Sequence, residues 1–175
     1  MKKKSNEVQS LILRYLMIIL IALPNLWIFY FIFTPLTIYP VYFLLKPFFE
    51  VSLSGNIIEI PNYYISIIKA CVAGSAYYLL LILNLSIPKI KLSQRVKMVL
   101  FAFVFLLVVN ILRIFLLVFF LDYSWFDITH KLFWYSLSTI FVIAIWFAEV
   151  KLFKIKQVPF YSDIKFLYHK SFLGR

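Results

Sequence analysis

Three residues of the types used in acyl transfer lie far apart in this sequence. Cys71 is the only cysteine of the chain, Arg113 interrupts the apolar run "VVNILRIFLL", and His130 lies in "DITHKLFW". A thiol is nucleophilic as the thiolate, and a nearby cation lowers its pKa. A histidine can act as general base and then protonate a leaving amine, while an arginine can stabilise the thiolate or the oxyanion of a tetrahedral intermediate. If the fold brings the three together, they form a cysteine-dependent acyl-transfer site.

Three further residues are expected to support this site. Asn110 precedes Arg113 by about one helical turn, so both lie on the same face of a helix. Asn110 could orient the guanidinium group or donate to a substrate. Gly74 and Ser75 belong to the small-residue cluster "ACVAGSA" that follows the cysteine. Small residues in membrane helices allow close helix packing, and Ala70 and Gly74 have the small-xxx-small spacing.

Each candidate also has a structural interpretation. A lone cysteine in an apolar segment is usually a small buried hydrophobic residue. His130 at the head of a helix is often an interfacial residue, and the adjacent Lys131 resembles a snorkelling anchor. Arg113 differs, because an arginine within a membrane span is energetically unfavourable and by default marks a functional site.

The composition indicates an integral membrane protein. Of 175 residues, 64% are hydrophobic and only 14% are charged, whereas a typical soluble chain is about 45–50% apolar and about 25% charged. The net charge of +11 comes from basic residues that flank apolar runs; nucleic-acid binding would place them on one folded face, so no nucleic-acid partner is expected. One cysteine and one outward histidine are too few for the usual zinc ligands, so we expect neither metal nor cofactor.

The apolar runs predict an all-α bundle of about four transmembrane helices in a single membrane domain, residues 1–175. The spans are expected at about 11–33, 65–87, 98–121 and 131–149, each near the roughly 20 residues needed to cross a bilayer. The run to Phe33 is too long for a signal-peptide core, so we interpret it as a retained span. The proline-rich stretch "PLTIYPVYFLLKPFFE" is predicted to be interfacial or re-entrant. A short outer hairpin is expected in "VSLSGNIIEIPNYY".

Charge predicts the orientation. Lysine and arginine concentrate in the tail 1–10, the loop 88–97 and the tail 150–175, and are sparse in 34–64 and 122–130. Positive segments stay in the cytoplasm, so both termini are expected inside, with the C-terminal tail as a solvated anchor on anionic lipid. Under this topology Cys71 lies about 9 Å and Arg113 about 13 Å below the outer surface, at 1.5 Å per residue. His130 lies where the chain re-enters the membrane, so the three share the outer layer.

At these residues the sequence resembles the archaeosortase/exosortase family of membrane cysteine transpeptidases. The motifs are "ACVAGSAYYLLL", "NILRI" and "DITHKLFW", and the resemblance covers a core at about residues 57–149. It implies that Cys71 is the nucleophile, Arg113 the essential cation and His130 the third catalytic residue. It further implies substrates with a C-terminal sorting signal, cut on the outer face through a thioester and passed to an amine-bearing acceptor, expected to be a membrane lipid. The run "VAGSAYYLL" favours an archaeal-type member.

Two other functions fit the same features. In a non-enzymatic membrane subunit or assembly factor, Arg113 would pair with a partner helix. In a small transporter, Arg113 would form an anion site in a cavity, but the sequence lacks the repeats and paired broken helices typical of transporters.

Overall fold

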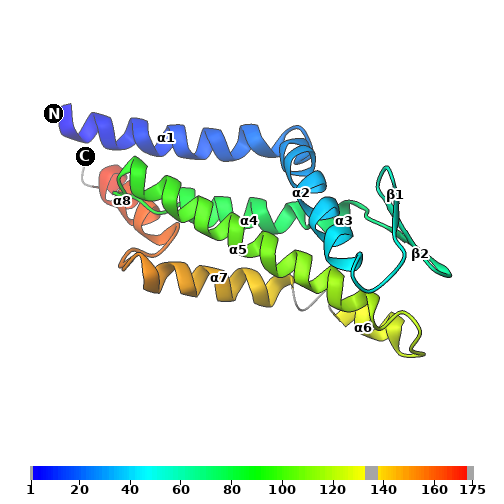
Figure 1. Cartoon of the computed structure of the whole chain (residues 1–175). Helices are drawn as coiled ribbons and strands as arrows, with labels where there is room; N and C mark the ends of the chain where they lie inside the picture. Colours follow the sequence, from blue (N-terminus) through cyan, green and yellow to red (C-terminus); the bar gives the residue numbers. More distant parts are fainter. Residues whose placement is uncertain (1, 133–137, 173–175) are drawn as a thin grey trace.

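The computed structural model describes the backbone of residues 2–132 and 138–172, and this part is mostly helical (Figure 1). Its elements in chain order are α1 (Lys2–Ala22), α2 (Trp27–Leu45), β1 (Ser52–Ser54), β2 (Ile57–Ile60), β3 (Tyr63–Ser66), α3 (Lys69–Val72), α4 (Gly74–Leu85), α5 (Leu92–Val118), α6 (Phe126–Leu132), α7 (Ser138–Leu152) and α8 (Tyr161–Phe172). The mostly helical character agrees with the prediction, while the small sheet means that the fold is not all-α.

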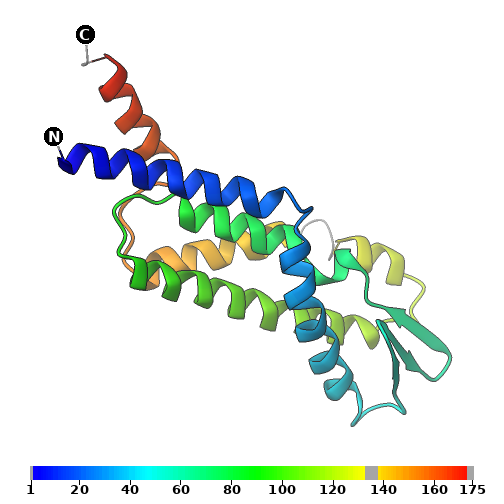
Figure 2. The same ribbon diagram turned by 90° about the horizontal axis from the view of Figure 1, so that it is seen from above.

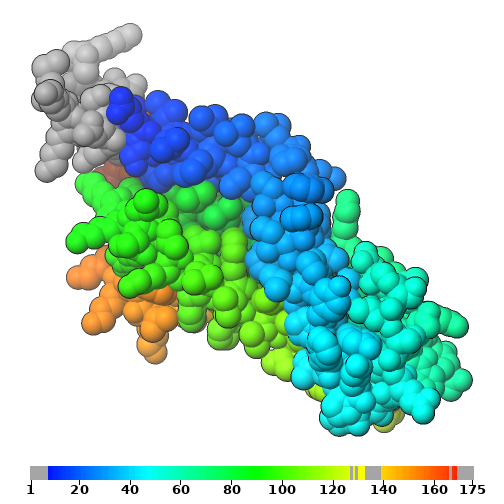
Figure 3. Space-filling view, turned by 45° about the horizontal axis from the view of Figure 1, so that its top comes forward, coloured from blue at the N-terminus to red at the C-terminus, as the bar shows by residue number. Residues whose placement is uncertain are grey.

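The long helices form an elongated bundle with different structures at its two ends. Helices α1, α4, α5 and α7 run alongside one another, and α2 is steeply inclined to them (Figures 1 and 2). The start of α1, the connection between α4 and α5, and α8 lie at one end; we call it the basic end, after the lysines and arginines of these segments. The sheet, α3 and α6 lie at the other, which we call the sheet end. Figure 3 shows α1 and α2 covering one side of the bundle.

Helix α5 presents an apolar stripe outward, and its buried face carries Arg95, Asn110 and Arg113 among apolar residues. Its exposed residues recur every four positions, at Leu100, Val104, Val108, Leu112 and Leu116, each 47–61% exposed. Its buried residues are Arg95, Met98, Ala102, Leu106, Asn110, Ile111, Arg113, Ile114, Leu117 and Val118. Residues three and four apart share a helix face, so the predicted placement of Asn110 with Arg113 on one face is confirmed. An apolar stripe facing outward is suited to lipid.

An aromatic cluster holds α2, α4 and α5 together. The rings of Phe33 on α2 and Tyr77 on α4 are stacked, with centroids 3.7 Å apart. Phe103 on α5 meets Tyr77 edge-on at 5.4 Å. Offset-stacked and edge-to-face pairs are the favourable aromatic geometries. This cluster fixes the inclined helix α2 against the two helices that lead to the candidate site.

Among the residues that the structure describes, two helices are long and apolar enough to cross a membrane by length and composition: Trp27–Leu45, with mean hydropathy 1.8, and Leu92–Val118, with mean hydropathy 2.8. Val8–Ala22 and Lys69–Leu85 are shorter apolar segments. Helix α5 contains most of the predicted span 98–121. The predicted span 131–149 corresponds to the end of α6 and to α7, and residues 133–137 lie outside the described residues.

The prediction of one continuous span over 11–33 is wrong. Helix α1 ends at Ala22, and α2 begins at Trp27. Between them, Pro24 has no N–H to continue the helix, and Asn25 and Leu26 have positive φ angles of 51° and 59°. The chain therefore changes direction here (Figure 2).

Residues 35–45 of the proline-rich stretch form the second half of α2, and its interfacial or re-entrant position stays a prediction. Pro35 and Pro40 lie inside this helix of 19 residues. Proline is tolerated in membrane helices where neighbouring helices and local adjustments compensate for the missing hydrogen bonds. Helix α2 does not return to the basic end (Figures 1 and 2). The later helices can therefore still alternate in direction between the two ends of the bundle, as the predicted spans do.

The predicted span 65–87 is also wrong in its first third. Residues 63–66 form β3, and the short helix α3 is separated from α4 by Ala73, whose φ of 58° is left-handed. A left-handed alanine costs about 1–3 kcal/mol and persists only where the surrounding structure holds it. Cys71 is therefore on a single helical turn between sheet and bundle, and not within a continuous membrane helix.

The predicted hairpin is confirmed, and a third strand extends it. Strand β1 pairs antiparallel with β2, joined by the turn at Gly55 and Asn56, and β2 pairs antiparallel with β3. The hydroxyl of Tyr63 on β3 donates to Asp122, just beyond α5, and this hydrogen bond raises the pKa of Tyr63. The sheet is thus attached to the end of the bundle that carries the candidate site.

The C-terminal segment is more than the solvated anchor that its charge predicts. Asp163 on α8 is buried and forms an ion pair of 2.9 Å with Arg14 on α1. Arg14 also donates to the carbonyl of Leu85 at the end of α4, and Tyr15 donates to Asp163. These contacts hold α8 against the basic end of the bundle.

Candidate active site

Cys71 is presented at the sheet end of the bundle by a short, strained turn. It lies on α3, where its backbone N–H donates to the carbonyl of Ile68 at 2.9 Å. Its side chain is half-buried and forms no disulfide. The left-handed Ala73 ends the turn and starts α4 in a new direction. This break allows the thiol to face a cavity rather than a neighbouring helix.

Helix α5 supplies two polar residues from its buried face. The side-chain amide of Asn110 donates to the carbonyl oxygen of Cys71 at 2.7 Å. Arg113, one turn further along, is 8% exposed and lines the same cavity as Cys71. Within the described part of the chain, the Nε of Arg113 is buried without a hydrogen-bond partner. A buried cation with an unused donor is suited to an anionic or carbonyl group that arrives with a substrate.

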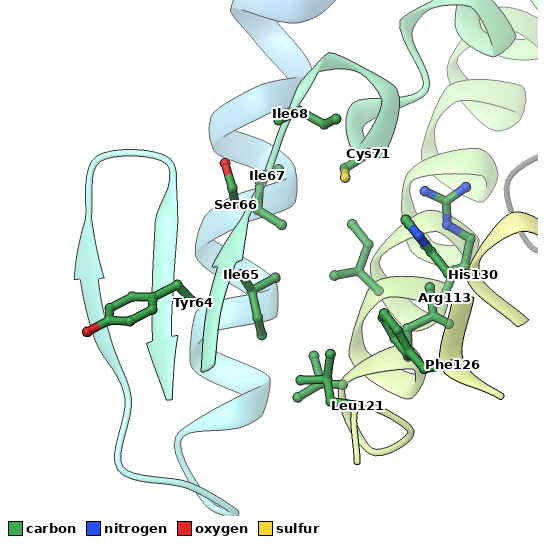
Figure 4. Close-up of a pocket in the computed structure, with 13 residues that line it drawn as sticks. Tyr64, Ile65, Ser66, Ile67, Ile68, Cys71, Arg113, Leu121, Phe126 and His130 are labelled. Atoms are coloured by element: carbon green, nitrogen blue, oxygen red, sulfur yellow. The ribbon is translucent and has the colours of Figure 1, made fainter. Parts of the chain in front are cut away.

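His130 comes from the far side of the cavity. It lies on α6, is exposed, and stacks on the ring of Phe126 with centroids 5.6 Å apart and planes 8° from parallel. Figure 4 shows its imidazole beside the guanidinium of Arg113, with the sulfur of Cys71 directed toward the same space. Stacking fixes the orientation of the ring while its nitrogens stay accessible.

Cys71, Arg113 and His130 line one cavity of about 280 Å³. Its other lining residues come from β3 and the segment after it, from the end of α5, and from α6: Tyr64, Ile65, Ser66, Ile67, Ile68, Ile114, Leu117, Val118, Leu121 and Phe126. The wall is mostly apolar, with the three candidate residues as its reactive groups. Such a cavity can exclude water around a thiol, a cation and a base.

Gly74 and Ser75 do not line this cavity. Gly74 is buried against Tyr30 of α2, where an added Cβ would lie 2.7 Å and 2.8 Å from ring carbons. Ser75 is exposed. Gly74 thus acts through close packing, as its residue type suggests, and Ser75 has no contact that links it to the thiol.

Sequence reasoning missed the contribution of the sheet to the cavity. The predicted spans put residues 65–68 at the start of a membrane helix and residue 64 in the external segment before it, although "NYYISII" is rich in β-prone residues. It also missed a buried polar group at the basic end, where Asn84 donates to Glu149 at 3.0 Å and Arg95 donates to carbonyls of Asn84 and Ile87. Among the described residues no group of three metal-binding side chains occurs.

A comparison with protein-family models gives one match at residues 6–150, to the family described as transmembrane exosortase (Exosortase_EpsH). The match includes all three candidate residues and every element from α1 to most of α7. Comparisons with curated proteins and with solved structures found no match.

Proposed function

Because this chain belongs to the transmembrane exosortase family, we propose that it is a cysteine transpeptidase that processes C-terminal sorting signals of exported proteins. The observation that carries the proposal is the cavity that contains the only cysteine, a buried arginine and a histidine from three different elements. Membership of the family identifies a membrane protein. The roles of individual residues, the orientation and the acceptor are part of the proposal, and the archaeal-type assignment stays a prediction.

The first half of the proposed reaction forms a thioester. His130 takes the proton of the Cys71 thiol, and the thiolate attacks the carbonyl carbon of the scissile peptide bond. Arg113 donates to the oxyanion of the tetrahedral intermediate. The intermediate collapses, the C–N bond breaks, and His130 delivers its proton to the leaving amine. The C-terminal tail departs and the exported protein stays attached to Cys71.

The second half transfers the protein to an acceptor. An amine of the acceptor, which we propose to be on a membrane lipid, attacks the thioester carbonyl while His130 removes its proton. The C–S bond breaks, the new amide forms, and the proton returns to the Cys71 thiolate. No cofactor is required, because each electron pair and each proton is accounted for by substrate, acceptor and the three side chains.

The proposed orientation places this site outside the cell. The sheet end would face outward, and the basic end, with residues 1–10, the loop 88–97 and residues 150–175, would face the cytoplasm. The catalytic core would comprise residues 57–149. The arrangement in Figure 2 supports this, because the start of α1, the loop before α5 and α8 share one end of the bundle.

The burial of Arg113 disfavours a non-enzymatic subunit that uses this residue to pair with a partner helix. Arg113 is 8% exposed and faces the cavity of its own chain. A residue that pairs with an external helix would instead be expected on the exposed stripe of α5, defined by Leu100, Val104, Val108, Leu112 and Leu116.

The experiment that tests the proposal is co-expression with a candidate substrate. The substrate is an exported protein from the same genome that ends in a short motif, an apolar segment and a basic end. Intact-mass spectrometry should show loss of this tail and, if transfer occurs, an added acceptor mass. A substrate that keeps its full mass with every such tail, at normal expression of the membrane protein, would contradict the proposed function.

A further inference from the structure

The cavity is bordered by one side of β3 and of the segment that follows it, with backbone as well as side chains. Five consecutive residues line it, Tyr64, Ile65, Ser66, Ile67 and Ile68. The side chains of a strand alternate between two faces, so a wall built from one face would include every second residue only. Figure 4 shows the side chains of Ile65 and Ile67 directed toward the cavity and those of Tyr64 and Ser66 directed away from it, so Tyr64 and Ser66 border the cavity through their backbone.

The register of the sheet identifies which backbone groups are free. In the described part of the chain the strand order is β1-β2-β3, so β3 has a neighbour on one side. The N–H of Ile67 donates to the carbonyl of Asn56, on the β2 side. Backbone groups of alternate residues in an antiparallel strand point to opposite sides. Ile65 and Tyr63 therefore also face β2, and the N–H and C=O groups of Tyr64 and Ser66 point along the unpaired edge.

We propose that β3 binds the sorting-signal peptide as an added strand, which pairs with the backbone of Tyr64 and Ser66 and leads to Cys71. This inference rests on the proposed function and specifies how its substrate is held. An unpaired strand edge is a template for an extended chain, and main-chain hydrogen bonds supply affinity in this mode of recognition. Cys71 follows Ser66 by five positions in the chain, so a peptide on this edge reaches the thiol directly.

The walls of the cavity specify the side chains of that peptide. An extended peptide directs alternate residues to the same side. Those that face the cavity meet Ile114, Leu117 and Leu121 from the end of α5 and beyond it. The peptide is therefore expected to place small or apolar residues at every second position before the scissile bond, while the positions between them face outward and tolerate polar residues.

Two proline substitutions separate edge pairing from general damage to the sheet. Ser66→Pro removes an N–H that points along the proposed binding edge, and proline is tolerated on edge strands whose N–H is not used within the sheet. The matched control is Leu53→Pro on β1. Leu53 lies opposite Ile58, whose backbone groups face β3, so the N–H of Leu53 points along the other edge. Ser66→Ala keeps the backbone donor and controls for the lost hydroxyl.

The readout is the cleavage rate of the tail-bearing protein that the wild-type enzyme processes, measured over a range of substrate concentrations. Loss of one intermolecular hydrogen bond is expected to raise KM about tenfold for Ser66→Pro relative to Ser66→Ala, which keeps the backbone donor, with Leu53→Pro close to wild type. Alkylation of Cys71 by iodoacetamide should be equal in all four proteins, which shows an intact site. Equal cleavage by Ser66→Pro and Leu53→Pro would overturn the inference but leave the proposed function standing.

Other outcomes are equally decisive. Absence of cleavage by the wild type would overturn the proposed function, and this inference with it. If Ser66→Pro cleaves normally but shifts the product from the transferred to the hydrolysed mass, the edge serves the acceptor and the proposal is wrong. If Ser66→Pro accumulates poorly, the wild-type enzyme is tested with synthetic tail peptides that carry one N-methyl amide each. Strand pairing requires losses of cleavage at alternate amides, and uniform losses would contradict it.

Discussion

At the scale of single residues, the proposed mechanism requires that the guanidinium of Arg113 can donate hydrogen bonds to a substrate. Its guanidinium is buried on the inner face of α5, and its Nε has no partner among the described residues. The residue type and its position within an apolar run predict a functional arginine from sequence alone. The hydrogen bond from Asn110 to the backbone of Cys71 was not predictable, because it depends on the break at Ala73 that brings this carbonyl to α5.

Arg113→Lys should lower the rate of tail cleavage by about 10²–10³-fold, the usual loss for one oxyanion donor. The compact ammonium of lysine keeps the charge but cannot reproduce the planar fork of guanidinium donors. The measurement is the rate of tail cleavage at saturating substrate concentration. His130→Ala is measured in the same assay; it removes the proton transfers and should lower this rate by about 10²–10⁴-fold. A Lys variant with wild-type rate would show that charge alone is needed and would contradict a directed role for the guanidinium.

Gly74→Ala should destabilise the protein by about 1–3 kcal/mol, the usual cost of overpacking. The added Cβ would lie 2.7 Å from a ring carbon of Tyr30, so the Tyr30 ring or α2 would have to move. The measurement is the thermal midpoint in detergent, with the adjacent exposed Ser75→Ala as the matched control. In a Tyr30→Ala background, which lacks the ring, Gly74→Ala should hardly change the thermal midpoint. If Gly74→Ala lowered the midpoint equally in the wild-type and Tyr30→Ala backgrounds, this contact would be ruled out as the cause.

At the scale of elements, helices with one strong period were predictable and interrupted segments were not. The period of α5 follows from its sequence, since apolar and polar residues repeat every three to four positions. The break at residues 23–26 and the strand β3 were missed, because Pro24 and "NYYISII" lie within long apolar runs where hydropathy alone shows no boundary. In such runs, the local backbone preferences of proline and β-branched residues decide where an element ends.

The attachment of α8 to the bundle was also not predictable from the sequence. Runs of like charge do not show which distant residues form a buried ion pair. Asp163→Ala should destabilise the protein by about 3 kcal/mol, since it leaves Arg14 buried without its partner. The thermal midpoint should fall and trypsin should cut at the exposed Lys165 more rapidly. Glu50→Ala, at an exposed acid, should change neither.

A double replacement distinguishes loss of the ion pair from loss of other contacts that Asp163 makes. Arg14→Leu combined with Asp163→Leu removes both charges, and a buried pair replaced by apolar residues is often neutral or more stable. The double variant should therefore regain most of the stability that Asp163→Ala loses. If it were as unstable as the single variant, Asp163 would stabilise α8 through contacts other than Arg14.

At the scale of the whole molecule, the arrangement of charge and the position of the cavity agree. The basic segments predicted to share the cytoplasmic side do lie at one end of the bundle, and the cavity lies at the other (Figure 2). This part of the fold was predictable because orientation follows from the distribution of lysine and arginine. The number of membrane spans was less predictable, because α2 is apolar enough to cross a membrane yet does not return to the basic end.

Labelling of single engineered cysteines tests the orientation. In a Cys71→Ala background, Ser54→Cys on β1 should react with a membrane-impermeant maleimide added to intact cells, because the sheet end is proposed to face outward. Ser93→Cys, in the first turn of α5 at the basic end, should react only after the cells are permeabilised. Both positions are exposed, so access of the reagent depends on the side of the membrane. Reaction at Ser93→Cys in intact cells would place the site on the wrong face.

Cys71 is proposed to be the nucleophile of tail cleavage, and the intact mass of the enzyme during the reaction tests this role. Because the chain has one cysteine, a thioester can form at one position only. We predict a wild-type species heavier by the mass of the tail-less substrate, released by hydroxylamine, and absent in Cys71→Ala, which should leave the substrate uncut. Cleavage of the tail by Cys71→Ala at the wild-type rate, with no adduct on the wild-type enzyme, would contradict the account.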